Sequence, residues 1–226
     1  MKKILLFACL SVLFACSKDK NTGRQGTYKS NGSIQYYSVS MLVKGAIINN
    51  REIINAYLKR REGILTFDFP KKGIGTISEK ITLNFSNTTV TQTVNGNETI
   101  TRYNLLGEKS DVVLLEQQDS IQVSQGIDTG ALGCSNIFWK TVLYPDTYHC
   151  SNIPGAQLCT VRPKLALTKE AGTLFIPYLS VMFTRGSGDC GVSFNNMRKI
   201  LNLGLLEELG ATDTLLVQTA MVPLNK

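Results

Sequence analysis

Alternation of apolar and polar residues, interrupted by turn sequences, constrains the fold of this 226-residue chain most. Residues 65–69 and 81–85 alternate with a period of two, which is typical of a strand with one buried face. The pair Asn95-Gly96 separates two further strand-like runs, at 89–94 and 98–105. Because Asn and Gly accept the positive φ of a type I′ turn, this pair predicts a β-hairpin.

Strand signals continue along the rest of the chain. Further strands are predicted at residues 38–44, 112–116, 140–144, 158–167, 173–184 and 214–222, and a second, short helix at 203–209. Segment 173–184 is apolar on both faces, which favours a central position that is covered on two sides. We therefore expect a mainly β protein, an antiparallel barrel or sandwich with one short amphipathic helix near the start; two small β lobes stay open as an alternative.

The main predicted helix covers residues 50–62. Asn49 can cap it, and Glu52 lies three residues further on, as in a capping box. The basic run 59–61 suits the negative end of the helix dipole, and Gly63 supplies the stop. This position explains the basic run without a ligand.

The glycine-rich segment 124–136 is the best candidate boundary within the chain. We expect a signal peptide at 1–15, a flexible tether at 16–33, an N-terminal β half at 34–123 with its helix at 50–62, and a C-terminal, disulfide-bonded β half at 137–226. At the level of fold alone, the short antiparallel strands and early helix resemble small ligand-holding barrels of the lipocalin type. No family motif is recognised in the globular part.

The first sixteen residues form a charged start, a short apolar run and a small residue before Cys16. These are the three parts of a secretory signal, and the apolar run is too short to span a bilayer. The stretch Leu13-Phe14-Ala15-Cys16 resembles a bacterial lipobox. That resemblance implies cleavage before Cys16, acylation of its thiol and new amino terminus, and attachment of the protein to a lipid bilayer.

Residues 17–33 are rich in Asn, Gly, Lys, Ser and Thr, and they predict a flexible tether. Lys18-Asp19 resembles the region after the cysteine in lipoproteins of Bacteroidota, where a Lys-Asp pattern directs display on the outer face of the outer membrane. We therefore expect an outer-membrane lipoprotein of the cell envelope, with surface exposure favoured over the periplasmic face.

The charge of the chain is mildly basic. Loss of Lys2 and Lys3 with the signal takes the 24 basic residues to 22 against 17 acidic ones, a net charge of +5. No stretch has the dense Lys/Arg run with interleaved aromatics that a nucleic-acid groove needs, so no nucleic-acid partner is expected. A basic surface is compatible with weak attraction to anionic lipid or polysaccharide.

Four cysteines remain once Cys9 has left with the signal and Cys16 carries lipid: Cys134, Cys150, Cys159 and Cys190. In an oxidising compartment an even set predicts two disulfides. Of the three connectivities we favour Cys150 with Cys159, because the turn sequence between them lets their ends meet, which leaves Cys134 with Cys190. The spacing of nine between Cys150 and Cys159 argues against a zinc site.

We find no catalytic, nucleotide or metal motif in the sequence, and we expect neither a cofactor nor a metal. His149 is the one histidine, which limits enzymatic hypotheses. Trp139, on a loop, is a candidate ligand contact, and Asp119-Ser120-Ile121 resembles the acceptor of O-linked glycans in Bacteroidota envelope proteins, which makes Ser120 a candidate modification site.

Three functions are consistent with these features. The first is a non-enzymatic lipoprotein that binds a ligand, either a protein or a carbohydrate, at the cell surface. The second is a structural or assembly accessory of an outer-membrane complex. The third is an envelope hydrolase whose acidic residues are scattered in the sequence. The single histidine and the lack of a nucleophile motif favour the first two.

Overall fold

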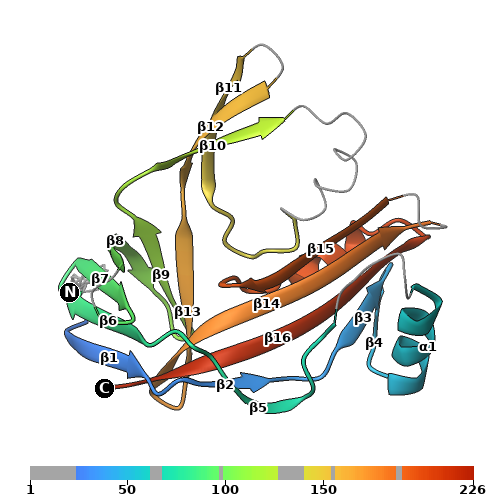
Figure 1. Ribbon diagram of the computed structural model, residues 1–226, viewed down its shortest axis with the longest axis horizontal. Helices are drawn as coiled ribbons and strands as arrows, with labels where there is room; N and C mark the ends of the chain where they lie inside the picture. The colour runs from blue at the N-terminus through green and yellow to red at the C-terminus, as the bar shows by residue number, and fades with distance from the viewer. Residues whose placement is uncertain (1–23, 62–67, 97–98, 127–139, 154–155, 187–189) are drawn as a thin grey trace, which may run out of the picture.

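The structure is a computed structural model that describes residues 24–61, 68–96, 99–126, 140–153, 156–186 and 190–226 (Figure 1). Antiparallel strands dominate the described residues, which hold one α-helix and one 3-10 helix. The strands are β1 (Gly26–Ser30), β2 (Ser33–Tyr36), β3 (Ser40–Val43), β4 (Ala46–Ile48), β5 (Gly73–Thr76), β6 (Ile81–Ser86), β7 (Thr89–Val94), β8 (Thr99–Glu108), β9 (Val112–Gln117), β10 (Ile121–Gly126), β11 (Thr147–Ile153), β12 (Ala156–Arg162), β13 (Lys164–Glu170), β14 (Thr173–Arg185), β15 (Cys190–Met197) and β16 (Asp213–Asn225); the helices are α1 (Arg51–Arg61) and η1 (Leu203–Glu207).

Eight of these strands close into an antiparallel barrel, in the order β14-β13-β9-β8-β7-β6-β1-β16, because β16 also pairs with β14. The predicted fold class is confirmed. Strands from both predicted halves of the chain take part, since β9 pairs with β13 and β1 with β16. The two halves are therefore not separate lobes.

Side chains fill the interior of the barrel. The period-two pattern of β6 places Ile81, Leu83 and Phe85 inside, where all three are buried. They pack in one cluster with residues from the other barrel strands, including Leu115 of β9 and Ile176 of β14. The barrel axis thus holds a packed core, in contrast to the ligand-holding barrels that its strand pattern resembles.

Strands β14 and β16 extend beyond the barrel. There they form a sheet that is covered on both faces, with β15 beside β14 and β3 beside β16 (Figure 1). Helix α1 covers one face, where Ile54 packs on Met182 and Leu216. The segment around η1 covers the other face, where Leu205 packs on Phe183. Burial of both faces explains why 173–184 carries apolar residues on both faces, and its predicted central position is confirmed.

A three-stranded sheet, β10-β12-β11, stands apart from the barrel at the top of Figure 1. It continues the pairing of β9 with β13, because β10 pairs with β12 beyond the edge of the barrel. Pro163 separates β12 from β13, although residues 158–167 are predicted as one strand. Proline has no N–H to donate to the ladder, and its carbonyl oxygen instead accepts from Gln117 N at 2.8 Å.

The predicted helix at 50–62 is present as α1, but its cap is Asn50 rather than Asn49. Asn50 Oδ1 accepts from the backbone N of Glu52 at 2.9 Å and of Ile53 at 3.3 Å, while Asn49 Oδ1 accepts from Ser40. The second predicted helix is shorter than expected, a 3-10 helix at Leu203–Glu207.

The hairpin predicted at Asn95-Gly96 is also present, and both residues have positive φ, 53° and 74°. Its connection is longer than a two-residue turn, because Val94 pairs directly with Thr99. Residues 97–98 lie outside the described residues.

Three further sequence predictions require correction or stay open. The tether ends earlier than residue 33, because β1 begins at Gly26 and Tyr28, 7% exposed, packs edge-on against Phe85 in the core. The prediction of a strand at 140–144 is wrong, because this segment forms only an isolated β-bridge, between Val142 and Leu201. The strand predicted at 65–69 lies mostly outside the described residues.

Candidate functional site

A groove lies beside α1, on the face of the β14/β16 sheet that this helix covers. One wall of the groove is α1 itself. Burial of Ile54 against Met182 and Leu216 fixes the helix on the sheet. This packing leaves Arg51 and Lys59 at the solvent-exposed edge of the groove.

The opposite wall is the segment 68–72, which precedes β5. Phe69 is partly buried and packs against the same apolar cluster as Ile54. The carbonyl oxygen of Pro70 accepts a hydrogen bond from Gln218 Nε2 of β16 at 2.7 Å. These two contacts attach the wall to the sheet and leave Lys71 and Lys72 exposed.

The groove between these walls has a volume of about 1010 Å³, which is at the upper end of the range for sites that hold small molecules. Met182 and Gln218 of the sheet form its floor, and Tyr37, which is 37% exposed, also borders it. The Tyr37 hydroxyl donates a long hydrogen bond, 3.6 Å, to Met221 Sδ, which does not line the groove.

The described residues that line the groove carry five positive charges and one negative: Arg51, Lys59, Arg61, Lys71, Lys72 and Asp68. Arg61 lies over the Tyr57 ring and donates to Gly186 O. Within the described part of the chain the other four cations form no ion pair. An excess of unpaired positive charge over a concave surface attracts anions.

Gln218 supplies a second polar feature of the groove. Its side chain is 3% exposed, and its Nε2 donates to Tyr37 O at 2.9 Å and to Pro70 O at 2.7 Å. No group among the described residues donates to its Oε1. A buried acceptor without a donor is rare in native proteins, and it draws attention to this side chain.

A second polar cluster lies at one end of the barrel, beside a smaller pocket of about 350 Å³. Arg198 Nε donates to Tyr178 Oη at 3.2 Å, and the guanidinium also pairs with Glu79. Burial raises the pKa of the Tyr178 hydroxyl, although the positive charge of Arg198 opposes this. Glu79 and Tyr178 already satisfy Arg198, so this cluster has a structural explanation.

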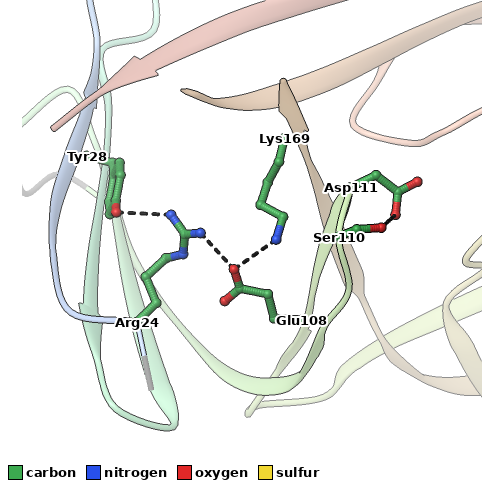
Figure 2. Close-up of polar contacts among 6 residues, drawn as sticks. All are labelled: Arg24, Tyr28, Glu108, Ser110, Asp111 and Lys169. Atoms are coloured by element: carbon green, nitrogen blue, oxygen red, sulfur yellow. Dashed lines mark hydrogen bonds and ion pairs between the residues drawn. The ribbon is translucent and has the colours of Figure 1, made fainter. Parts of the chain in front are cut away.

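A third cluster joins the start of the described chain to the barrel (Figure 2). Glu108 Oε1 accepts from Arg24 at 2.7 Å and from Lys169 at 3.0 Å, and Arg24 also donates to Tyr28 Oη at 3.1 Å. The hydrogen bond from Arg24 lowers the pKa of Glu108 from its ordinary value of 4.5, and the one from Lys169 adds to this, although burial opposes both. This cluster fixes β1 against β8 and β13.

The predicted site residues have different outcomes. The sulfur atoms of Cys150 and Cys159 lie at bonding distance, 2.11 Å, and the two residues face each other across β11 and β12, so this predicted disulfide is confirmed. Ser120 is exposed between β9 and β10. Cys190 begins β15. The remaining candidates, Cys16, Cys134 and Trp139, lie outside the described residues.

Sequence reasoning missed the groove. The basic run at 59–61 has a local explanation in the helix dipole, and the position of these residues in the last turn of α1 agrees with that explanation. The pair Lys71-Lys72 could have indicated a basic surface, yet nothing in the sequence shows that this pair lies opposite α1. Gln218, within an apolar strand, was a second unused signal.

The described residues contain no helix that is long and apolar enough to cross a membrane. They also contain no group of His, Cys, Asp and Glu side chains that is arranged to hold a metal ion. Comparisons of the chain with protein-family models, with curated proteins and with solved structures found no match.

Proposed function

We propose that this protein is a lipid-anchored protein of the bacterial cell envelope, displayed on the outer face of the outer membrane, that binds an anionic ligand without transforming it. The signal sequence and lipobox-like stretch that end at Cys16 support the location. The observation that carries the binding function is the basic groove between α1 and residues 68–72.

The charge of the groove suits reversible binding of an anion. Each exposed cation at about 4 Å from a negative charge contributes roughly 1 kcal/mol in water. Several such contacts together give useful affinity, and because they are exposed, salt weakens them. The walls are attached to the sheet by buried side chains and hydrogen bonds, which fix the backbone positions that carry the cations.

Calorimetric titration of the full-length protein in a nonionic detergent tests this function. The probes are two hexamers of similar charge, galacturonic acid hexamer and glutamate hexapeptide. At least one should bind at about 0.05 M salt and bind more weakly at about 0.15 M salt, as screening of exposed charges requires.

Two double variants test whether that binding occurs in the groove. Lys71→Gln with Lys72→Gln should weaken binding about tenfold, as loss of roughly 1.4 kcal/mol requires. The matched control, Lys44→Gln with Lys80→Gln, removes the same charge from exposed positions outside the groove and should have little effect. Failure of both hexamers to bind, or equal weakening by both double variants, would refute the proposed function.

A further inference from the structure

We infer that the ligand of the groove is a linear polyanion, a chain that lies along α1 and carries several negative groups, rather than a small anion with one or two. The inference rests on the proposed function and specifies the length and charge spacing of the ligand of the same site. The shape of the groove and the distribution of its cations support it.

The groove follows the whole length of α1. The helix residues that line it include a row with the i, i+3, i+4, i+7, i+8 spacing of a single helix face: Arg51, Ile54, Asn55, Leu58 and Lys59. This row begins in the first turn of the helix and reaches the last. At a rise of 1.5 Å per residue, Arg51 and Lys59 lie about 12 Å apart along the helix axis. The groove is therefore an elongated trough.

The opposite wall has a similar length. It consists of the consecutive residues 68–72, all of which line the groove. Even when fully extended, such a segment spans at most about 14 Å between its first and last Cα atoms. The packing of Phe69 and the hydrogen bond from Gln218 to Pro70 O hold its backbone on the sheet. A ligand that fills the space between the two walls is thus about as long as four or five residues of an extended chain.

The cations are spread along this trough. Arg51 and Lys59 lie near the two ends of the helix wall, Lys71 and Lys72 lie on the opposite wall, and all four are exposed. Within the described part of the chain they form no ion pair. One small anion could contact both Arg51 and Lys59 only if their side chains turned inward against their mutual repulsion. A chain with several negative groups meets each cation where it stands.

The floor between the two walls carries no charge. Ile54, Leu58, Phe69 and Met182 contribute apolar side chains to the lining. The uncharged backbone of a linear ligand can lie over this floor while its negative groups turn toward either wall. In an extended chain successive side groups point to opposite sides, which suits a trough with cations on both walls.

The test varies the length of the ligand. Two series, glutamate peptides and galacturonic acid oligomers of two, six and ten residues, are titrated into the full-length protein in nonionic detergent at about 0.05 M salt. Calorimetry follows the longer chains, and NMR titration follows the weakly binding dimers. Six extended glutamate residues span about 17 Å, enough to follow the trough, whereas two do not.

In any series whose hexamer binds, the hexamer should bind at least about 25-fold more tightly than the dimer, as two added exposed contacts require. This ratio exceeds the factor of about five that comes from the overlapping dimer frames within a hexamer. The decamer should gain no more than about fivefold over the hexamer, the number of hexamer frames that it contains, because the trough is already filled.

Variants at the two ends of the helix wall provide a second test. Arg51→Gln and Lys59→Gln should each weaken binding of the hexamer about fivefold, as loss of one exposed contact requires. Each should weaken the dimer less than about twofold, because a dimer that loses one end of the trough still binds at the other. The matched control Arg60→Gln removes the same charge from an exposed position on α1 that does not line the groove, and it should leave both affinities nearly unchanged.

Each outcome decides between the two proposals. A hexamer that gains no more over the dimer than its frames account for would overturn the polyanion inference and leave the proposed function intact, since a small anion would then suffice. A decamer that gains far more than its frames would also overturn it, because the whole basic surface would then attract the chain. Absence of binding by both hexamers would remove both proposals. The length series needs no variant, so it decides even if a variant does not fold.

Discussion

The guanidinium of Arg24 lies 2.7 Å from Glu108 Oε1, and this ion pair joins the start of the described chain to the barrel (Figure 2). Lys169 pairs with the same carboxylate oxygen from β13. One carboxylate therefore links three segments that are far apart in the sequence, which makes the stability of the barrel sensitive to its protonation.

Glu108→Gln should lower the free energy of unfolding by about 1 kcal/mol at neutral pH, as expected for a partly exposed ion pair. The pKa of Glu108 is lowered in the folded protein, so its contribution is complete above the ordinary value of 4.5 and is lost as the pH falls through the folded pKa. Urea unfolding at neutral and acidic pH measures this: the difference between wild type and variant should shrink in acid.

The matched control is Glu170→Gln, because Glu170 is exposed and forms no ion pair within the described chain. It should leave the stability at neutral pH nearly unchanged. A Glu108→Gln difference that stays constant from neutral to acidic pH would contradict the role assigned to this carboxylate.

Ala171→Asn should stabilise the protein by about 1 kcal/mol. Ala171 is exposed in the turn between β13 and β14, with a φ of 45°, a left-handed conformation that asparagine tolerates better than alanine. Thermal unfolding measures the gain. Ala46→Asn, at an exposed alanine outside the left-handed region, is the control and should give no gain; equal effects of the two would count against the turn explanation.

The disulfide between Cys150 and Cys159 should stabilise mainly the β10-β12-β11 sheet. By the chain-entropy argument, replacing both residues by serine destabilises by up to about 3 kcal/mol. Hydrogen exchange should speed up in β11 and β12 and stay unchanged in β6, whose side chains belong to the barrel core. Ser151→Ala, on the same strand, controls for a change at an exposed position. Faster exchange throughout the barrel would show that the sheet is not an independent unit.

Cys16→Ala should move the protein from the membrane fraction to the soluble fraction. Each buried methylene of an acyl chain contributes roughly 0.8 kcal/mol, so loss of all chains removes the attachment. Cys9→Ala is the matched control, since Cys9 is expected to leave with the signal and its loss should not alter fractionation. Intact-mass measurement of the mature wild-type protein provides a second readout, and an unmodified Cys16 would contradict the anchor.

Local patterns in the sequence predicted those parts of the fold that depend on neighbouring residues. The alternation at 81–85 predicted β6, and the two-sided apolar segment 173–184 predicted the covered strand β14. The pairing of Cys150 with Cys159 followed from the short turn sequence between them. Failures arose where a single residue overrode the pattern, as Pro163 does by ending β12.

The groove could not be predicted in the same way. Its cations come from α1 and from residues 68–72, and its buried acceptor, Gln218, lies 148 residues beyond Pro70, to which it is hydrogen-bonded. Each piece has an ordinary local explanation, such as a basic helix end or an isolated glutamine in an apolar strand. Only their convergence on one surface indicates binding.

The sequence by itself determined the mainly β character of the protein and the position of its main helix, because these depend on composition and on short-range periodicity. Only the tertiary structure decided that eight strands close a packed barrel and that β14 and β16 extend past it to carry a basic groove. Strand closure and groove formation depend on contacts between residues far apart in the chain, and short-range patterns do not encode which distant segments meet.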